Sequence, residues 1–203
     1  MKFSIILADP PWRFKNWSMK ELATRGEKWA RKNGRSPYDV MDLEDIANLP
    51  IQSIAADNCV LFLWATHPKL EEAFYIIKKW GFTYKTVAFT WVKQTPLKNG
   101  WHFGLGYWTR QNPELCLLAT KGRPKRVNAS VANLVISPLG RHSRKPDEVR
   151  RRIVELMGDL PRIELFCTED DEHTEDWTIA GDAVDGMDIR ESLKIIANWE
   201  SDE

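Results

Sequence analysis

Short apolar runs, separated by segments with helical spacing, constrain the fold of this chain more than any other feature. Residues 59–65, CVLFLWA, form a continuous apolar run typical of a strand covered on both faces of a sheet. Strands that alternate with helices predict an α/β fold with a mostly parallel central sheet flanked by helices. Further strand-like runs cover residues 2–7, 86–93, 114–120, 132–137 and 162–167.

The helices of this pattern begin and end at recognisable residues. Pro146 predicts a helix start and Gly158 the end of the same helix. Asp188 and Glu191 form an Asp-x-x-Glu start signal for a final helix. Residues 94–112 hold three glycines and a proline, which predicts a long loop. Helices are therefore expected at 43–49, at 70–77, from Pro146 to Gly158 and from Asp188 onward.

The length of 203 residues predicts a single domain spanning 1–203. No apolar run approaches the roughly 20 residues of a membrane helix, and residues 3–8 are too few for the apolar part of a signal peptide. The three cysteines lie in separate strand-like runs and the four histidines are scattered, which indicates buried, reduced thiols and no metal site. We therefore expect a cytoplasmic protein with no membrane partner.

The charges are balanced overall, with 29 basic and 29 acidic residues, but they are unevenly distributed. Residues 13–36 have a net charge of +6 and residues 121–152 a net charge of +8, whereas residues 164–191 have −10. Two basic stretches in a neutral protein favour a polyanionic partner such as nucleic acid. Solvated surfaces are the alternative interpretation of each stretch. Tryptophans within 13–37 and 94–112 suit base stacking, so both segments are predicted to be mobile loops for substrate or an interface.

The segment LADPPWRF, residues 7–14, leaves the first strand in an unusual way. Asp9 lies at the carboxyl end of that strand, where α/β sheets bind their ligands. The prolines have no amide hydrogen for Asp9 to cap, which weakens the alternative that it only stabilises a turn. The Pro10 carbonyl adds a second acceptor, and Trp12, expected to be exposed, can stack on a ring. The segment therefore predicts a site for a planar aromatic amine.

Adenine N6 is such an amine, and it is a poor nucleophile because its lone pair is delocalised into the ring. Two acceptors on its hydrogens favour a pyramidal nitrogen with a freer lone pair, a gain realised mainly in the transition state. Attack on a positively charged methyl donor requires no metal. The base has to leave its stack, or be single-stranded, to reach such a site.

The chain resembles the MT-A70 family of S-adenosylmethionine-dependent adenine N6-methyltransferases, whose catalytic signature is matched by DPPW at 9–12. The match extends over most of the chain, and an ordered set of motifs is more specific than one motif alone. It implies a Rossmann-like methyltransferase fold. The further matching segments are PYDVM at 37–41, LFLWAT at 61–66, WGF at 80–82, WVK at 91–93, GYW at 106–108, ELCLLATKG at 114–122, HSRKPDEV at 142–149 and IELF at 163–166.

The resemblance implies a role for each matching position. Lys121 matches a lysine that reaches the donor's carboxylate, and Asp182 stands where the family usually has an Asn that contacts the ribose. Without the resemblance, the alternative interpretation of Lys121 is an ordinary solvated lysine. The alternative for His142, Ser143 and Lys145 is that they cap the helix that begins at Pro146. Thr168 stands at a position where many members of the family have an Arg. The catalytic residues implied are Asp9, Pro10, Pro11 and Trp12, and the donor contacts implied are Asp9, Lys121, His142, Ser143, Lys145, Phe166 and Asp182.

The expected function is methylation of adenine N6 in DNA by a bacterial or phage-type enzyme. The expected substrate contacts are Trp12, Tyr38, and Lys15 and Arg110 from the two loops. No inserted recognition domain is visible, so short or relaxed sequence specificity is expected. The alternatives are an RNA adenine methyltransferase, a non-catalytic nucleic-acid-binding member of the family, and a cytosine methyltransferase, which Asp9 disfavours. A homodimer through the aromatic loop is a further expectation.

Overall fold

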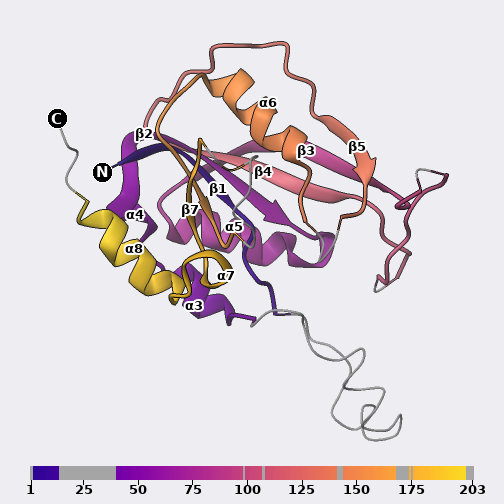
Figure 1. Cartoon of the computed structure of the whole chain (residues 1–203), viewed down its shortest axis with the longest axis horizontal. Coiled ribbons are helices and arrows are strands. Elements are labelled where there is room, and N and C mark those ends of the chain that lie inside the picture. Colours follow the sequence, from indigo (N-terminus) through magenta and orange to yellow (C-terminus); the bar gives the residue numbers. More distant parts are fainter. Residues whose placement is uncertain are drawn as a thin grey trace, which may run out of the picture.

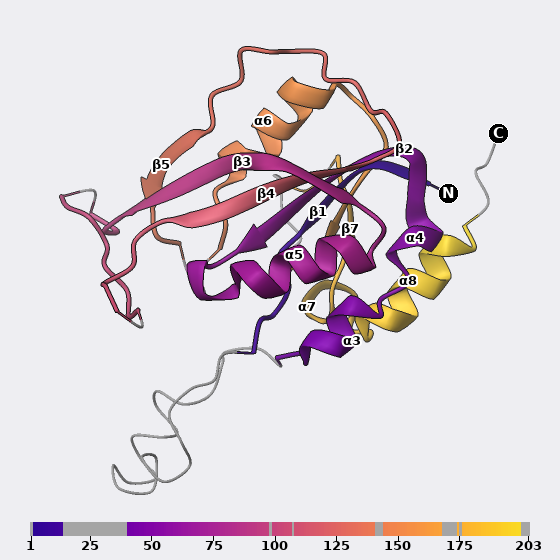
Figure 2. The same cartoon turned by 180° about the vertical axis from the view of Figure 1, so that it is seen from behind.

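A computed structural model describes residues 2–13, 40–97, 99–106, 108–140, 144–167, 174 and 176–199. One seven-stranded sheet runs through the molecule, with helices on both of its faces (Figure 1 and Figure 2). The strand order is β5-β3-β4-β2-β1-β6-β7. The strands are β1 (Phe3–Ala8), β2 (Ala55–Ala65), β3 (Thr83–Gln94), β4 (Glu114–Lys121), β5 (Leu134–Pro138), β6 (Arg162–Leu165) and β7 (Thr178–Ala180).

The sheet is mixed, and β4 is its antiparallel strand. β4 lies between β2 and β3 and runs opposite to both, whereas the other neighbouring pairs are all parallel. The α/β expectation is therefore confirmed, and the expectation of a mostly parallel sheet holds only in part. The amino end of β4 consequently lies beside the carboxyl ends of β2 and β3, and its carboxyl end lies beside their amino ends.

The alternation of side chains along β2 supplies both hydrophobic cores. Leu61 and Leu63 pack on one face of the sheet, and Phe62 and Trp64 pack on the other. A strand that is apolar on both faces explains the continuous run at 59–65. The first face is covered by α3 (Leu43–Ala47), α4 (Ile51–Ile54), α5 (Leu70–Lys79) and α8 (Ile189–Ala197), and the second by α6 (Asp147–Met157).

The predicted helix ends agree closely with the structure. Helix α6 begins after Pro146 and ends at Gly158, whose φ of 85° few other residues adopt without strain. The Asp188 side chain accepts a hydrogen bond from the Arg190 N–H at the start of α8. The elements that the sequence pattern did not reveal are α4, the 3-10 turn η1 (His67–Lys69), β7 and α7 (Asp182–Asp185).

The two segments predicted to be loops differ in how much is described. Most of 13–37 lies outside the described residues. Segment 95–112 connects β3 to β4 and carries isolated bridges between Gln94 and Trp101 and between Gly104 and Gln111. None of the described helices is both long and apolar enough to cross a membrane.

Candidate active site

Charged residues from separate strands meet at one edge of the sheet. Asp9 directly follows β1, Lys93 lies one residue before the end of β3, and Glu114 is the first residue of β4. Because β4 is antiparallel to β3, Glu114 pairs with Trp91 near the end of β3. We call this end of the sheet, where the parallel strands finish, the carboxyl edge. It is the edge at which α/β sheets bind their ligands.

Four charges form a continuous buried network at the carboxyl edge. The Lys145 Nζ, just before α6, lies 2.6 Å from the Asp9 Oδ2 and 3.2 Å from the Glu114 Oε2. The Lys93 Nζ donates to the Glu114 Oε1. The side chains of Lys145, Lys93 and Glu114 are 13%, 11% and 9% exposed, whereas that of Asp9 is 36% exposed. Asp9 is therefore the most exposed member of this network.

Two tryptophans form an aromatic wall beside these charges. The Lys145 Nζ lies 5.5 Å from the ring centroid of Trp64, and the Lys93 Nζ lies 4.9 Å from that of Trp91. The two rings pack edge to face with centroids 6.4 Å apart. Cation–π contacts of this kind stabilise ammonium groups that have lost water.

Burial and neighbouring charges shift the pKa values of the network. Burial alone would raise the pKa of Glu114, but the ammonium groups of Lys145 and Lys93 outweigh it and lower that pKa. Burial would lower the pKa of Lys145, but the Asp9 and Glu114 carboxylates raise it instead. Burial raises the pKa of Asp9, Glu114 adds to the rise, and Lys145 opposes it. The environment thus shifts the pKa values of the two carboxylates in opposite directions, upward for Asp9 and downward for Glu114.

The turn after Asp9 is anchored to the body of the protein. The Trp12 N–H donates to the Pro10 carbonyl at 2.8 Å, and the Met41 N–H donates to the Pro11 carbonyl at 3.1 Å. The Trp12 indole N–H donates to the Trp64 carbonyl at 3.3 Å. Trp12 is only 7% exposed and belongs to the hydrophobic core, so the expectation of an exposed Trp12 is wrong. The physical reason is that the indole N–H finds a backbone acceptor while the ring packs on apolar neighbours.

The ends of β6 and β7 complete the carboxyl edge. Phe166 follows β6 with a φ of 64°, a left-handed conformation that is rare for an aromatic residue. A Cβ at Gly181 would lie 2.4 Å from the Cys167 carbonyl oxygen, so these two segments approach as closely as a glycine allows. Asp182 follows Gly181 at the start of α7 and is exposed. Phe166 and Asp182 therefore lie at the same edge as Asp9.

The sequence model of the MT-A70 family matches residues 3–183. The chain belongs to the MT-A70 family. It is 31% identical over 175 residues to the Type II methyltransferase M.MunI of Mycoplasma sp., with 82% of this chain and 72% of that protein covered. It is 29% identical to the N(6)-adenosine-methyltransferase MT-A70-like of Arabidopsis thaliana, covering 95% of this chain and 25% of the relative. It is 27% identical to the human N(6)-adenosine-methyltransferase catalytic subunit METTL3, covering 93% and 29%. The chain thus spans most of M.MunI and about a quarter of the other two.

The MT-A70 resemblance predicted a donor contact that the structure does not bring to this edge. Lys121 is the last residue of β4, so the antiparallel course of that strand carries it to the opposite edge, beside Cys59. Its Nζ donates to the Ala55 carbonyl at 3.4 Å. The structure thus corrects the prediction that Lys121 contacts the donor with Asp9. Lys15, Tyr38, His142 and Ser143 lie outside the described residues.

The loop between β3 and β4 carries the remaining predicted contact. The Arg110 guanidinium is exposed and donates to the Phe103 carbonyl at 2.7 Å. Trp108 is fully exposed, and Trp101, Phe103 and Leu105 are also exposed. This surface suits base stacking as well as an interface between two copies, so both predictions for the loop stand.

Lys93 and Glu114 are members of the charge network beside Asp9 that sequence reasoning missed. Both lie within the quoted motifs WVK and ELCLLATKG, and each is a charged residue at the end of an apolar strand. A charged residue at a strand end indicates a site only if that end lies at the carboxyl edge. For Glu114 this depends on the direction of β4, which the sequence pattern does not reveal. No group of His, Cys, Asp and Glu within the described ranges has the composition of a metal site.

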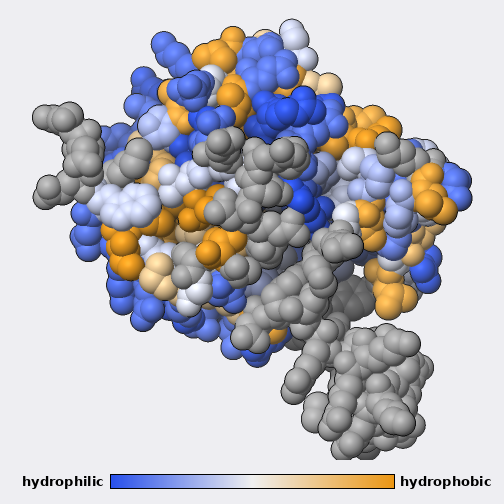
Figure 3. Space-filling view, in the orientation of Figure 1, coloured by the Kyte–Doolittle hydropathy of each residue, from blue (hydrophilic) through white to orange (hydrophobic). Residues whose placement is uncertain are grey.

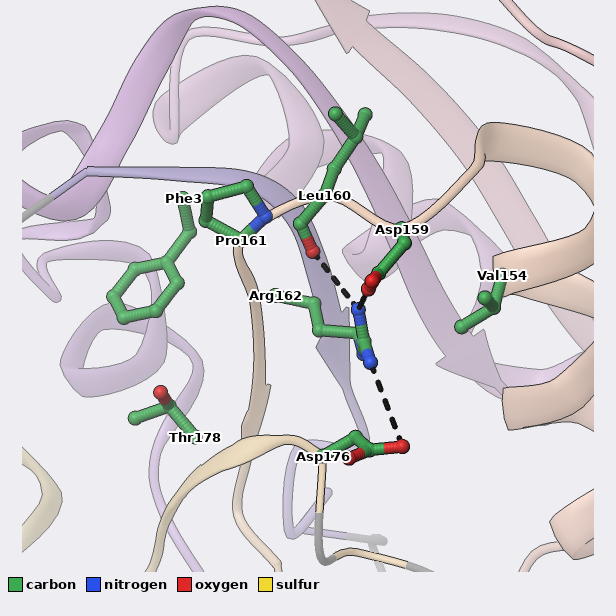
Figure 4. Close-up of a pocket in the computed structure, with 8 residues that line it drawn as sticks. All are labelled: Phe3, Val154, Asp159, Leu160, Pro161, Arg162, Asp176 and Thr178. Atoms are coloured by element: carbon green, nitrogen blue, oxygen red, sulfur yellow. Dashed lines mark hydrogen bonds and ion pairs between the residues drawn. The ribbon is translucent and has the colours of Figure 1, made fainter.

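A cavity of about 590 Å³ lies at the opposite edge, at the amino ends of β1 and β6 (Figure 4). Its lining includes Phe3, Leu160 and Arg162. The Arg162 guanidinium bonds to the Asp159 carboxylate at 2.6 Å and lies 3.8 Å from the Asp176 carboxylate. This cavity is therefore separated from the carboxyl edge by the length of the strands.

Proposed function

We propose that this protein transfers a methyl group from S-adenosylmethionine to N6 of adenine in nucleic acid, with DNA preferred to RNA. The observation that carries the proposal is the Asp9 carboxylate, which ends β1 beside two prolines and holds a charged N–H donor, Lys145, at 2.6 Å. A carboxylate in this position can accept a hydrogen of an amine. In a family named for an adenosine methyltransferase, N6 of adenine is the amine that fits.

The residues of the DPPW turn supply acceptors for the amine. Asp9 would accept one hydrogen and the Pro10 carbonyl the other. That carbonyl already accepts the Trp12 N–H, and a carbonyl oxygen has a second lone pair for a ligand. Localising the lone pair on the nitrogen would speed its attack on the methyl carbon. The bond from that carbon to sulfur would break with its electron pair left on sulfur, and the proton that N6 then loses would pass to Asp9 or to water. Because Trp12 is only 7% exposed, little of its ring is open to a base.

The carboxyl edge fits S-adenosylmethionine by the chemistry of its groups. Asp9 binds a primary ammonium here, that of Lys145, as it would bind the ammonium of the donor. Phe166 and Asp182 lie at the same edge and would contact the remainder of the molecule. When bound, S-adenosylmethionine supplies a methyl group on a positively charged sulfur.

The preference for DNA is supported by the similarity to the Type II methyltransferase M.MunI, most of whose length is covered. RNA is the second candidate, because the Arabidopsis and human relatives are named adenosine methyltransferases. The test is incubation of the purified chain with labelled S-adenosylmethionine and matched DNA and RNA oligonucleotides, followed by digestion to nucleosides. Label in N6-methyldeoxyadenosine is expected. The oligonucleotides that become labelled should share at most a short sequence around the methylated adenine. Label only in N6-methyladenosine would assign the protein to RNA, and donor binding without any transfer would indicate a non-catalytic member.

A further inference from the structure

One surface of the molecule carries basic side chains that take no part in the charge network of the carboxyl edge. Arg151 lies on the solvent side of α6, and Arg123, Lys125 and Arg126 lie on the loop between β4 and β5. All four are exposed, and none of their side chains has an ion pair with another residue in the part of the chain that the structure describes. We call these four residues the basic face.

The loop is fastened to α6, so the four cations belong to one surface. The Val127 N–H donates to the Leu156 carbonyl at 2.8 Å, near the end of the helix. The Asn128 amide donates to the Glu155 carboxylate at 2.9 Å. Farther along, the Arg152 guanidinium donates to the carbonyls of Ala132 and Leu134 at 2.6 and 2.8 Å. These bonds hold the middle of the loop and its junction with β5 against the second half of α6.

Few acidic side chains neutralise this surface, and the exposed Glu155 lies against the loop, where it accepts from Asn128. Asp147 is paired with Arg144 and Arg150, and Glu148 is paired with Arg152. Residues 121–152 carry ten Lys or Arg and only these two acids. Figure 3 shows strongly hydrophilic side chains gathered over the region of α6. An excess of unpaired cations on one surface attracts polyanions.

The basic face leads away from the carboxyl edge along α6. The helix starts two residues after Lys145, which binds Asp9, and its eleven residues span about 16 Å at 1.5 Å per residue. One strand of a nucleic-acid duplex has a phosphate about every 3.4 Å along the axis. The length of α6 alone therefore corresponds to roughly five phosphate spacings of one strand.

We propose that the basic face binds the phosphodiester backbone of the nucleic acid whose adenine enters the carboxyl edge. This proposal rests on the proposed function and adds where the substrate lies: it crosses the α6 face of the sheet, not the face covered by α5 and α8. Contacts to phosphate position a substrate without reading its sequence, in keeping with relaxed specificity.

The test is the double variant Arg126→Glu/Arg151→Glu, with Lys78→Glu/Lys194→Glu as the matched control. Lys78 and Lys194 are exposed on α5 and α8, so the control makes the same change in charge on the other face. Affinity is measured by fluorescence anisotropy with labelled DNA and RNA oligonucleotides over a range of salt concentrations. Thermal unfolding followed by circular dichroism checks that every variant is folded. The variant Arg126→Gln/Arg151→Gln repeats the test without new negative charges.

For Arg126→Glu/Arg151→Glu, affinity is expected to fall about tenfold or more, and the slope of log K against log salt to decrease by about two. KM for the oligonucleotide should rise while kcat at saturation and donor binding stay unchanged. Wild-type affinity and slope in this variant, or an equal loss in the control, would overturn the proposal. If the wild type showed this binding pattern and transferred no methyl group, the proposed function would fail and the basic face would stand.

Discussion

The Lys145 ammonium lies 2.6 Å from the Asp9 carboxylate, although 136 residues separate the two in the chain. Lys145 is also held by Glu114, which is fixed in turn by Lys93. Lys145 can therefore keep one carboxylate partner while Asp9 accepts a hydrogen from a ligand. In the proposed function, Asp9 would therefore stand between the internal ammonium of Lys145 and the amine of a substrate.

Asp9→Asn is expected to lower kcat by about 100-fold or more, because an amide can direct its N–H toward the amine and carries no charge to localise the lone pair. The measurement is transfer of labelled methyl at saturating donor and oligonucleotide, with circular dichroism to show that the fold persists. Asp57→Asn, an exposed change at the opposite edge of the sheet, should retain wild-type activity. Full activity in Asp9→Asn would exclude the proposed role of the carboxylate.

The acid limb of kcat/KM should report the ionisation of Asp9. Burial raises its pKa, so activity is expected to be lost on acidification at a pH above the ordinary aspartate value of about 3.9. Lys145→Met removes the ammonium that opposes this rise, so the limb should move to higher pH by about one unit or more. Lys145→Arg keeps the charge and should restore the wild-type limb. An unmoved limb in Lys145→Met would mean that Lys145 does not act through Asp9.

Glu114→Gln should lower the free energy of unfolding by about 3 kcal/mol at neutral pH, because it leaves two buried ammonium groups facing a neutral amide. The folded-state pKa of Glu114 is lowered, so its contribution is fully present above the unfolded value of about 4.3 and is lost as pH falls through the folded value. The difference between wild type and Glu114→Gln should therefore shrink on acidification. Urea unfolding at several pH values measures it, with the exposed Glu71→Gln as control.

The cysteines should be inert toward alkylation in the folded protein. Burial raises the pKa of the Cys59 thiol to about 12 and that of Cys116 well above its usual value, and Cys167 is buried as well. Because the thiolate is the reactive form, iodoacetamide at pH 8 should modify none of the three until denaturant is added. Mass spectrometry of intact protein counts the adducts. Rapid labelling of the native protein would contradict this burial.

Gly181→Ala should destabilise the carboxyl edge by about 1 to 3 kcal/mol. Its Cβ would lie 2.4 Å from the Cys167 carbonyl oxygen and 2.9 Å from its nitrogen, and these are backbone atoms that cannot move aside independently. Thermal unfolding and donor affinity should both decline. Gly100→Ala is the matched control, because a Cβ there meets nothing within 4 Å. Equal melting temperatures for the two variants would argue against the tight approach of β6 and β7.

Most elements were predictable from local patterns, and each exception has an identifiable physical cause. β2 extends back to Ala55 through Asp57 and Asn58, whose polar side chains interrupt the apolar run while their backbone remains extended. β7 has three residues and lies at the edge of the sheet, too short for any period to be detected. Trp12 was expected to be exposed because the neighbouring prolines suggested a projecting turn, but its burial depends on distant contacts with Trp64 and Met41.

The sequence by itself determined that strands alternate with helices and that the DPPW segment follows the first strand. Asp9 with its prolines and the family motifs are properties of residue type and order. Only the tertiary structure decided which charges surround Asp9. An apolar strand has the same two-residue period in both directions, so the pattern of 114–121 contains no information about its course. The antiparallel pairing of β4 brings Glu114 to the carboxyl edge and carries Lys121 to the other one, because a strand has only one end at each edge of a sheet.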